Sequence, residues 1–340
     1  MTEYLVLGAG AIGGSLAHYL ARSGHAVTVV DADAEHVAAI RSHGIVLVDP
    51  VTGEEDAALV AAAHTPEELT GLGTLTRVLL ATKSHHVADA AAWLAPMLPE
   101  DGAVLLCQNG DTFGLAAESL GADRVLSAFV NFAADVVAPG RIRSGGPGMM
   151  VIGERRGDRT DRVAVFVEDL RGFGEVEASD DVEGYLWSKR GIAAVLSATS
   201  LVDEHTATVI DEHRDVMSAV VSEVVAVTRA EGIALHPFDG IDAFDLTVDA
   251  DPDARRLAFD ALVRFTGSLP GKERSGVFRD LAVRRRPTEA RPELRSVIAA
   301  GERHGIEAPH LRRLERLLGE IEAGERGFGR ANLAELAVTN

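Results

Sequence analysis

The sequence has little cysteine, few aromatic residues and no long apolar run. Its single cysteine, Cys107, excludes a disulfide framework and favours a reducing, cytoplasmic location. No apolar stretch approaches the roughly 18 residues of a membrane span, and no basic segment of a secretory signal opens the chain. We therefore expect neither a membrane anchor nor a secreted protein.

Basic side chains are also in the minority. The chain carries 33 Lys and Arg against 52 Asp and Glu, a formal charge of −19, which argues against nucleic acid or an anionic membrane as a partner. Its histidines are scattered without the spacing of metal ligands, so no metal site is predicted. The exception is the cluster Arg284-Arg285-Arg286, which we interpret as a solvated helix face, with contact to an anionic ligand as the alternative.

What is present predicts two domains, 1–180 and 181–340, in an α/β chain. Strand-like runs separated by helical spacers occupy the first half: YLVLG (4–8), HAVTVVD (25–31), RVLLATK (77–83), AVLLCQNG (103–110) and RVLSAFVNF (124–132). This rhythm predicts a Rossmann-type, doubly wound parallel sheet. Residues 133–153 are expected to add antiparallel strands that close the same sheet.

The second half reads as all-helical. In 216–232 the apolar residues fall on one helix face and the pattern stops at Gly232, while 291–305 begins with a proline in its first turn and also ends on glycine. Almost nothing after residue 180 reads as a strand. The acidic segment 177–184 is interpreted as the hinge between the two domains.

A glycine-rich turn follows the first strand-like run. Gly8, Gly10 and Gly13 form a GxGxxG pattern that, with the intervening Ala11 and Ile12, opens a helix. Such glycines allow a tight turn and a close approach of backbone amides to a pyrophosphate, which the helix N-terminus stabilises. The sequence therefore predicts a dinucleotide site here, with a purely structural helix–strand turn as the alternative.

Asp31 ends the second strand-like run and addresses the choice of dinucleotide. A carboxylate at this place accepts hydrogen bonds from an unmodified adenine ribose and repels a 2′-phosphate. No arginine or lysine lies in 32–40. We therefore expect NAD(H) to be preferred, with NADP(H) as the alternative cofactor. The competing interpretation is that Asp31 caps the following helix.

Lys189 lies in GYLWSKRGIAAVLSATSLVDE (184–204), where the residues after it are mostly small or apolar. A cation carried into an apolar wall needs compensation for lost hydration, or a chemical role. Without further context, an ordinary lysine that reaches solvent from an amphipathic helix is the simpler reading.

The order of GAGAIGG, ATKSHH, LCQNG, LWSK and PTEARPELRS resembles the ketopantoate reductases (2-dehydropantoate 2-reductases). The resemblance implies a Rossmann domain, a helical domain and an active site in the cleft between them. It also implies hydride transfer from a nicotinamide to the carbonyl of a 2-oxo acid, giving a 2-hydroxy acid. The sequence leaves the oligomeric state open, with a homodimer as one alternative.

Carried onto this chain, the resemblance makes Lys189 the catalytic lysine that binds the reacting oxygen and supplies its proton. It makes Glu289 a carboxylate near that lysine, and it places Asn109 at the junction of cofactor and substrate. Lys83 matches a lysine on the nicotinamide side, which gives it a role toward cofactor and substrate. An ammonium beside a carbonyl oxygen that gains negative charge stabilises the transition state, so the chemistry agrees with these assignments.

The chain also departs from the family pattern. Many members carry asparagines four and eight residues after the catalytic lysine, where this chain has Ala193 and Ser197. From these two residues alone we expect a substrate pocket that tolerates an apolar branched or aromatic side chain. The family's substrate-binding serine falls on Ser275 or on Gly276, an alternative that the sequence leaves open. His85 and His86 either add polar groups to the site or face solvent.

Two other functions compete with a 2-oxo acid reductase. One is a reductase of a different carbonyl or imine on the same scaffold, in a specialised biosynthetic pathway. The other is a dinucleotide sensor without turnover, which would need the glycine loop but not Lys189, Asn109 and Glu289 together.

Overall fold

The computed structural model describes residues 3–69, 75–110, 112–155, 157, 159–268 and 273–338. The chain divides into two compact units, Met1–Val182 and Glu183–Asn340. This division falls close to the sequence-based boundary at residues 180 and 181. Each unit is described below by itself.

The strands and helices have the following bounds. The strands are β1 (Glu3–Leu7), β2 (Ala26–Val30), β3 (Ile45–Val48), β4 (Glu55–Ala58), β5 (Ala61–Ala63), β6 (Arg77–Leu80), β7 (Ala103–Leu106), β8 (Val125–Asn131), β9 (Ala134–Ala138), β10 (Arg141–Ser144), β11 (Gly148–Gly153) and β12 (Gly174–Ala178). The first helices are α1 (Ala11–Arg22), α2 (Ala34–His43), α3 (Val87–Leu94), α4 (Phe113–Leu120) and α5 (Asp161–Asp169). The later helices are α6 (Val182–Thr199), α7 (Thr206–Glu212), α8 (Arg214–Ala230), α9 (Pro252–Gly267), α10 (Gly276–Phe278), α11 (Ala290–Arg303), α12 (Pro309–Glu322) and α13 (Arg330–Leu336).

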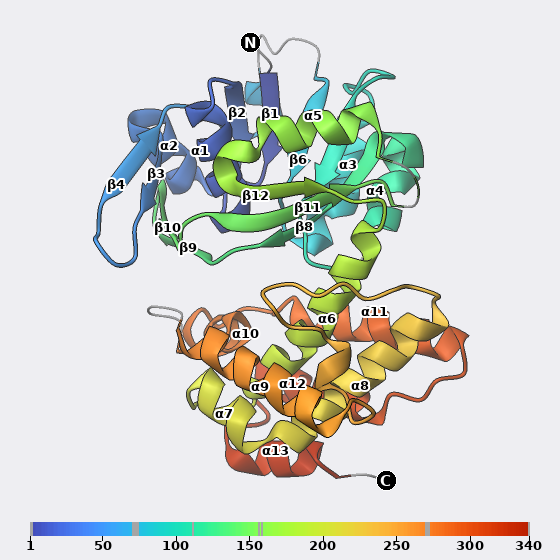
Figure 1. The fold of residues 1–340 in the computed structure, drawn as a ribbon. Coiled ribbons are helices and arrows are strands. Elements are labelled where there is room, and N and C mark those ends of the chain that lie inside the picture. Colours follow the sequence, from blue (N-terminus) through green and yellow to red (C-terminus); the bar gives the residue numbers. More distant parts are fainter. Residues whose placement is uncertain are drawn as a thin grey trace. The chain divides into compact units, whose positions relative to one another are not determined.

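An eight-stranded sheet organises the first unit, in the order β12-β11-β8-β7-β6-β1-β2-β5 (Figure 1). The six strands from β8 to β5 run parallel, whereas β11 is antiparallel to β8. Starting from β1, the chain adds β2 and β5 on one side and then returns to add β6, β7 and β8 on the other side. This is the doubly wound order, and its switch point lies between β1 and β6. This confirms the predicted Rossmann-type sheet and puts the end of β1 at its switch point.

Both faces of this sheet are covered, which explains why its strands read as continuous apolar runs. Alternate residues of β1 point to opposite faces: Tyr4 and Val6 belong to a core packed with α1 and α5, and Leu5 and Leu7 belong to a core packed with α3 and α4. Cys107 is buried in the first of these cores, and burial raises the pKa of its thiol to about 12. The cysteine is therefore an inert core residue, as its apolar surroundings in the sequence predict.

A second, four-stranded sheet in the order β4-β3-β10-β9 corrects one expectation from the sequence. Of the strands in 133–153, only β11 joins the large sheet, whereas β9 and β10 form the edge of the small one. The small sheet packs on α1, where Ile142 of β10 and Ile45 of β3 are fully buried in the same core as Leu16. Burial against a helix that is already in place therefore decides the pairing of these strands.

The second unit is helical, as predicted. Over its described residues, strand pairing is limited to an isolated bridge between Phe238 and Ile241. Helix α8 packs on both α11 and α12. Its buried face contains all five apolar positions that the sequence pattern selects: Met217, Val220, Val221, Val224 and Val225.

The hydroxyl of Tyr4 ties β1 to the end of α5, because it donates a 2.7 Å hydrogen bond to Oδ2 of Asp169. Burial raises the pKa of Tyr4, so the phenol keeps the proton that it donates. We expect Tyr4→Phe to lower the free energy of unfolding by about 1.5–3 kcal/mol, the range for a hydrogen bond to a charged acceptor. Urea denaturation followed by circular dichroism measures this change. Tyr19→Phe is the control, because the Tyr19 hydroxyl has no hydrogen-bond partner among the described residues. Equal stability of the two variants would contradict the assignment.

Candidate active site

The glycine loop after β1 has a conformation that larger residues would not reach. Gly8 has a φ of +90°, and a Cβ there would lie 2.8 Å from the backbone of Ala81 and Thr82, just after β6. A Cβ on Gly13 would lie 1.9 Å from the carbonyl oxygen of Gly8. The two glycines therefore let the start of α1 pack tightly against the loop at the switch point of the sheet.

The start of α1 fits a bound pyrophosphate. Gly10 is the N-cap, and a Cβ added to it would meet no atom within 4 Å, so the backbone here faces open space. Within the described residues no side chain caps this helix, and its first turn, which includes Ala11 and Ile12, holds no acidic group. Unpaired amides and the positive end of the helix dipole are what a phosphate binds, so these residues suit the dinucleotide that the sequence predicts.

Asp31 is fixed beside the glycine loop by two backbone amides. Its Oδ2 accepts from the Ala9 N–H at 2.7 Å and its Oδ1 accepts from the Asp33 N–H at 3.0 Å. The alternative that Asp31 caps the next helix is wrong, because Asp33 is the N-cap of α2 and accepts from the His36 N–H. The Asp31 carboxylate therefore holds its negative charge at the carboxyl end of β2, next to the loop.

His36 is a part of this site that the sequence does not reveal. Its ring is buried, and Nδ1 accepts a 3.0 Å hydrogen bond from the Gly140 N–H, so Nε2 carries the proton. That Nε2–H donates to the Ala9 carbonyl oxygen at 2.9 Å. The imidazole thus links the glycine loop to the turn before β10. A histidine in an alanine-rich helix has no pattern that indicates such a role.

Lys83 and Asn109 follow neighbouring parallel strands, β6 and β7, and both are exposed. The buried side chain of Gln108 holds these two strand ends together, because its amide donates to the carbonyls of Leu80 and Thr82 at 2.8 and 3.0 Å. Gln108 is a second supporting residue that the sequence reading omits, although it is the Q of the quoted LCQNG motif. It sets the positions from which Lys83 and Asn109 extend.

His85 and His86 are exposed, with ring centroids 4.1 Å apart, which agrees with the solvent-facing alternative. In the arginine cluster, Arg284 and Arg286 both bind the Asp280 carboxylate at 2.9 Å. One carboxylate thus offsets part of the positive charge of an exposed cluster. The solvated interpretation agrees with this exposure, but the predicted helix face is wrong, because the helical turn ends at Val283 before the cluster.

In the second unit, α6 carries two cations in succession. Burial lowers the pKa of Lys189 to about 8, although the carboxylates of Glu293 and Asp239 act in the opposite direction. The next residue, Arg190, is buried and its guanidinium lies 4.4 Å from the centre of the Trp187 ring. Lys189 therefore differs from an ordinary solvated lysine, because its surroundings stabilise the neutral amine more than water does.

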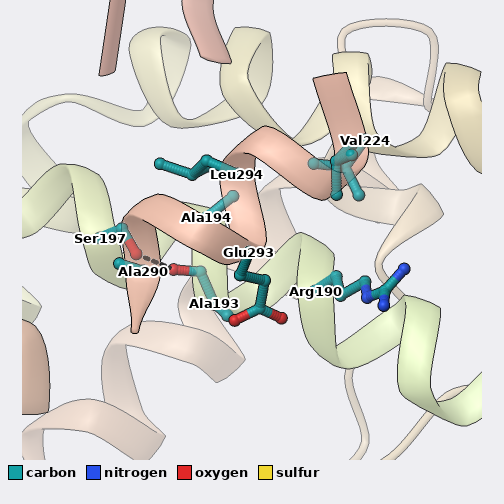
Figure 2. Close-up of a pocket in the computed structure, with 9 residues that line it drawn as sticks. Arg190, Ala193, Ala194, Ser197, Val224, Ala290, Glu293 and Leu294 are labelled. Atoms are coloured by element: carbon teal, nitrogen blue, oxygen red, sulfur yellow. Dashed lines mark hydrogen bonds between the residues drawn. The ribbon is translucent and has the colours of Figure 1, made fainter. Parts of the chain in front are cut away.

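A pocket opens beside Arg190, between α6, α8 and α11 (Figure 2). Its lining comprises Arg190, Ala193, Ala194, Ser197, Val224, Ala290, Glu293, Leu294 and Val297. The two positions that depart from the family pattern, Ala193 and Ser197, thus face one cavity. The Ser197 hydroxyl donates back to the Ala193 carbonyl oxygen at 2.7 Å. Glu293 adds a charge to the pocket that the sequence reading did not assign, although Glu289 and Glu293, four residues apart, indicate a shared face of α11.

Glu289 and Ser275 both lie at helix starts. Glu289 is half-buried at the N-cap of α11, and its charge acts on Glu293, whose pKa it raises. Ser275 is buried at the N-cap of α10, where its Oγ accepts from the Phe278 N–H at 3.2 Å. The acceptor side of this hydroxyl is therefore used within the chain, and its proton remains to donate. Gly276, the alternative serine position, is exposed.

The described ranges contain no cluster of three or more His, Cys, Asp or Glu side chains arranged to hold a metal ion. Among the helices that the structure describes, none combines the length and apolar character that a membrane crossing needs.

A glycine loop at the switch point of a parallel sheet, and a lysine of lowered pKa in a helical unit, are features of nicotinamide-dependent oxidoreductases of the Rossmann type. Comparison with known families is more specific. The family described as ketopantoate reductase PanE/ApbA matches residues 4–157, and the family of its C-terminal domain matches residues 181–322. The chain belongs to the ketopantoate reductase family.

Individual relatives agree with this family. The 2-dehydropantoate 2-reductase of Mesorhizobium japonicum is 32% identical over 206 residues, which cover 54% of this chain and 62% of the relative. That match thus spans less than two thirds of the relative's length. A ketopantoate reductase structure from Ralstonia eutropha is 28% identical, with a TM-score of 0.78 over 96% of this chain and all of the other.

A D-mandelate dehydrogenase solved with NADH and anilino(oxo)acetate has a TM-score of 0.80 at 20% identity, over 95% of this chain and 99% of the other. At this identity the likeness shows the fold alone.

The His36 link provides a test of the cofactor loop. We expect His36→Ala to lower the free energy of unfolding by about 2–4 kcal/mol, because it leaves two buried backbone groups without partners. We also expect the Kd for NADH to rise about tenfold as the loop loses its support, an effect of about 1.4 kcal/mol. Calorimetric titration and urea denaturation measure the two effects. His43→Ala, at an exposed position of α2, should change neither. Unaltered NADH affinity in His36→Ala would rule out the supporting role.

Proposed function

We propose that the protein reduces the carbonyl of a 2-oxo acid, 2-dehydropantoate or a related branched acid, to the 2-hydroxy acid. The observation that carries the proposal is Lys189, a lysine of α6 whose pKa is lowered to about 8 and whose neighbour Arg190 lines a pocket of the helical unit. Family membership and the glycine loop support it. The name of the Mesorhizobium relative and of the Ralstonia structure points to the same reaction.

The nicotinamide cofactor, when bound, supplies the hydride that adds to the carbonyl carbon. Gly8, Gly10 and Gly13, with the amides of Ala11 and Ile12, hold its pyrophosphate at the start of α1. Asp31 binds the hydroxyls of the adenine ribose. Lys83 and Asn109, on adjacent strand ends, serve the nicotinamide and substrate side of the same unit.

Lys189 is the general acid of the proposal. Its ammonium donates a hydrogen bond to the carbonyl oxygen and transfers its proton as negative charge builds there, so the oxygen becomes a hydroxyl and the lysine a neutral amine. An acid with a pKa near the working pH transfers a proton more readily than an unperturbed lysine does. Glu289, at the start of α11, orients the ammonium together with the charges of Glu293 and Asp239.

The substrate carboxylate binds at Ser275 in this proposal. Oγ of Ser275 accepts the Phe278 N–H, and its proton is available to donate to a negatively charged partner. Ala193 and Ser197 line the pocket for the substrate side chain. The D-mandelate dehydrogenase of the same fold was solved with anilino(oxo)acetate, a ligand that carries an aromatic ring.

A cytoplasmic location and a homodimer complete the proposal. The single cysteine is buried and free, which suits a reducing compartment. Sedimentation of the purified chain tests the homodimer.

The position of Asp31 supports a preference for NADH. We expect kcat/KM to favour NADH over NADPH by tenfold or more, because a fixed carboxylate opposes a 2′-phosphate with about 1 kcal/mol or more. Asp31→Asn keeps an acceptor for the Ala9 amide and removes the charge, so it should narrow the ratio with little effect on kcat. Asp33→Asn is the matched control, since asparagine is an equally good N-cap. A clear NADPH preference of the unaltered protein would show that the ribose is read elsewhere.

The role of Lys189 predicts the pH dependence of reduction. The acid must be protonated, so kcat/KM should be level below the Lys189 pKa of about 8 and fall tenfold per pH unit above it. In the oxidation direction Lys189 acts as the base, and the rate should rise through the same pH. Lys189→Ala should lower kcat by about 10²–10⁴ while NADH binding is retained.

The carboxylates of Glu293 and Asp239 act on Lys189, and Glu293 in turn interacts with the charges of Arg190 and Glu289. Glu302→Gln, on the exposed side of α11, serves as the control and should leave both kcat and its pH dependence unchanged. Near-normal turnover by Lys189→Ala would show a lysine without a chemical role. Cofactor binding without turnover of any 2-oxo acid by the unaltered protein would favour the sensor instead.

A further inference from the structure

One wall of the pocket beside α6 carries a carboxyl group. Glu293, in the first turn of α11, extends toward the α6 residues Ala193 and Arg190 (Figure 2). It is half-buried, and no hydrogen bond or ion pair engages its carboxyl group within the part of the chain that the structure describes. A half-buried carboxyl group that no hydrogen bond satisfies is costly, and the nearby charges of Arg190 and Lys189 offset burial only in part, so its presence at a pocket indicates a ligand that donates to it.

Helix α6 offers little to such a ligand. Ala193 has no polar side-chain atom, and the Ser197 hydroxyl donates its proton to the Ala193 carbonyl oxygen, so its oxygen is left as a neutral acceptor. The remaining lining from α8 and from the rest of α11 is apolar or alanine. Among the lining residues, Glu293 therefore supplies the carboxyl acceptor, which is a stronger partner for a donating ligand than a serine oxygen.

The charges nearby limit what Glu293 binds. Burial raises the pKa of Glu293, and the positive charges of Arg190 and Lys189 oppose that rise. An ammonium on the ligand would meet these two cations, and a carboxylate on the ligand would meet Glu293 itself. A neutral hydroxyl group is compatible with both, because it can donate to the carboxylate without adding charge to the pocket.

We propose that Glu293 binds a hydroxyl group on the side chain of the 2-oxo acid and thereby determines specificity for a hydroxylated substrate. The inference rests on the proposed 2-oxo acid reduction and deepens it. It transfers to α11 the polar contact that the family resemblance places at 193 and 197 on α6. Ala193 and Ser197 predict a preference for an apolar substrate side chain, but that prediction uses the residues of α6 alone. Glu293 supplies a polar group from the facing helix, α11.

The test compares 2-dehydropantoate with trimethylpyruvate, which has a hydrogen in place of the side-chain hydroxyl and is otherwise the same. We expect the unaltered protein to have a kcat/KM at least tenfold higher for 2-dehydropantoate. Glu293→Leu should reduce this ratio by about 10–100-fold, the effect of one lost polar contact to a substrate hydroxyl. Both substrates use the same proton from Lys189, so a change in the acidity of Lys189 cancels in the ratio.

Two further variants separate the contact from a general effect on the unit. Ala193→Asn added to Glu293→Leu returns a polar group to the facing position and should restore most of the ratio. Glu302→Leu removes a carboxylate from the exposed side of the same helix and should leave the ratio unchanged. Glu293→Gln keeps the shape of the side chain and one acceptor, so its ratio of kcat/KM for the two substrates should be intermediate. This variant tests the inference if Glu293→Leu does not fold.

The outcomes are distinct. A ratio that is the same in the unaltered protein and in both Glu293 variants overturns the inference and leaves the proposed reductase intact. A preference of the unaltered protein for trimethylpyruvate also overturns it. Absence of turnover with every 2-oxo acid overturns the proposed function, and the inference falls with it.

Discussion

The loss of water around the Lys189 ammonium is the constraint on which the helical unit depends. A lysine in this position is costly, and the cost appears directly as a pKa lowered to about 8. Glu293 and Asp239 limit that cost without removing it, because their charges favour the protonated form. The balance keeps Lys189 mostly protonated at neutral pH while making its proton easier to transfer than that of a surface lysine.

The lowered pKa of Lys189 also makes the stability of the fold depend on pH. The folded pKa of Lys189 lies below its ordinary value of 10.5, so between about pH 8 and 10.5 the unfolded chain binds more protons than the folded one. Lys189 therefore destabilises the fold fully below about pH 8, and the effect is relieved as the pH rises through that window. The unit thus keeps at neutral pH a residue that weakens it, which is typical of a group retained for chemistry.

Much of this arrangement could be predicted from the sequence, for physical reasons that differ between elements. The parallel sheet was predictable because strands buried on both faces are apolar throughout, as in β1 and β7. Helix α8 was predictable because one face is apolar at a period of 3.6. The glycine loop combines a strand, close-packed glycines and a helix start in a short segment, so its signal is local and strong.

The parts that escaped prediction depend on contacts between distant residues. Strands β9 and β10 have the composition of sheet-edge strands, and burial of Ile142 on α1 decides which sheet they join. His36 supports the glycine loop through Gly140, more than a hundred residues away, and nothing near His36 in the sequence announces that partner. Such pairings come from tertiary structure, which a local pattern does not contain.

Glu293 was missed for a different reason. Its spacing from Glu289 was visible in the sequence, but the polarity of the pocket was predicted from the α6 residues alone. The departures Ala193 and Ser197 were judged on their own helix, where they remove polar groups. A pocket is lined by several helices, however, and the α11 face that starts at Glu289 continues at Glu293 into the same space. The effect of an apolar residue on one helix of the pocket can therefore be predicted only together with the residues of the facing helix. For this chain, the loss of an asparagine at 193 and the presence of a carboxyl group at 293 are two halves of one feature, and the polarity of the pocket is set by their sum.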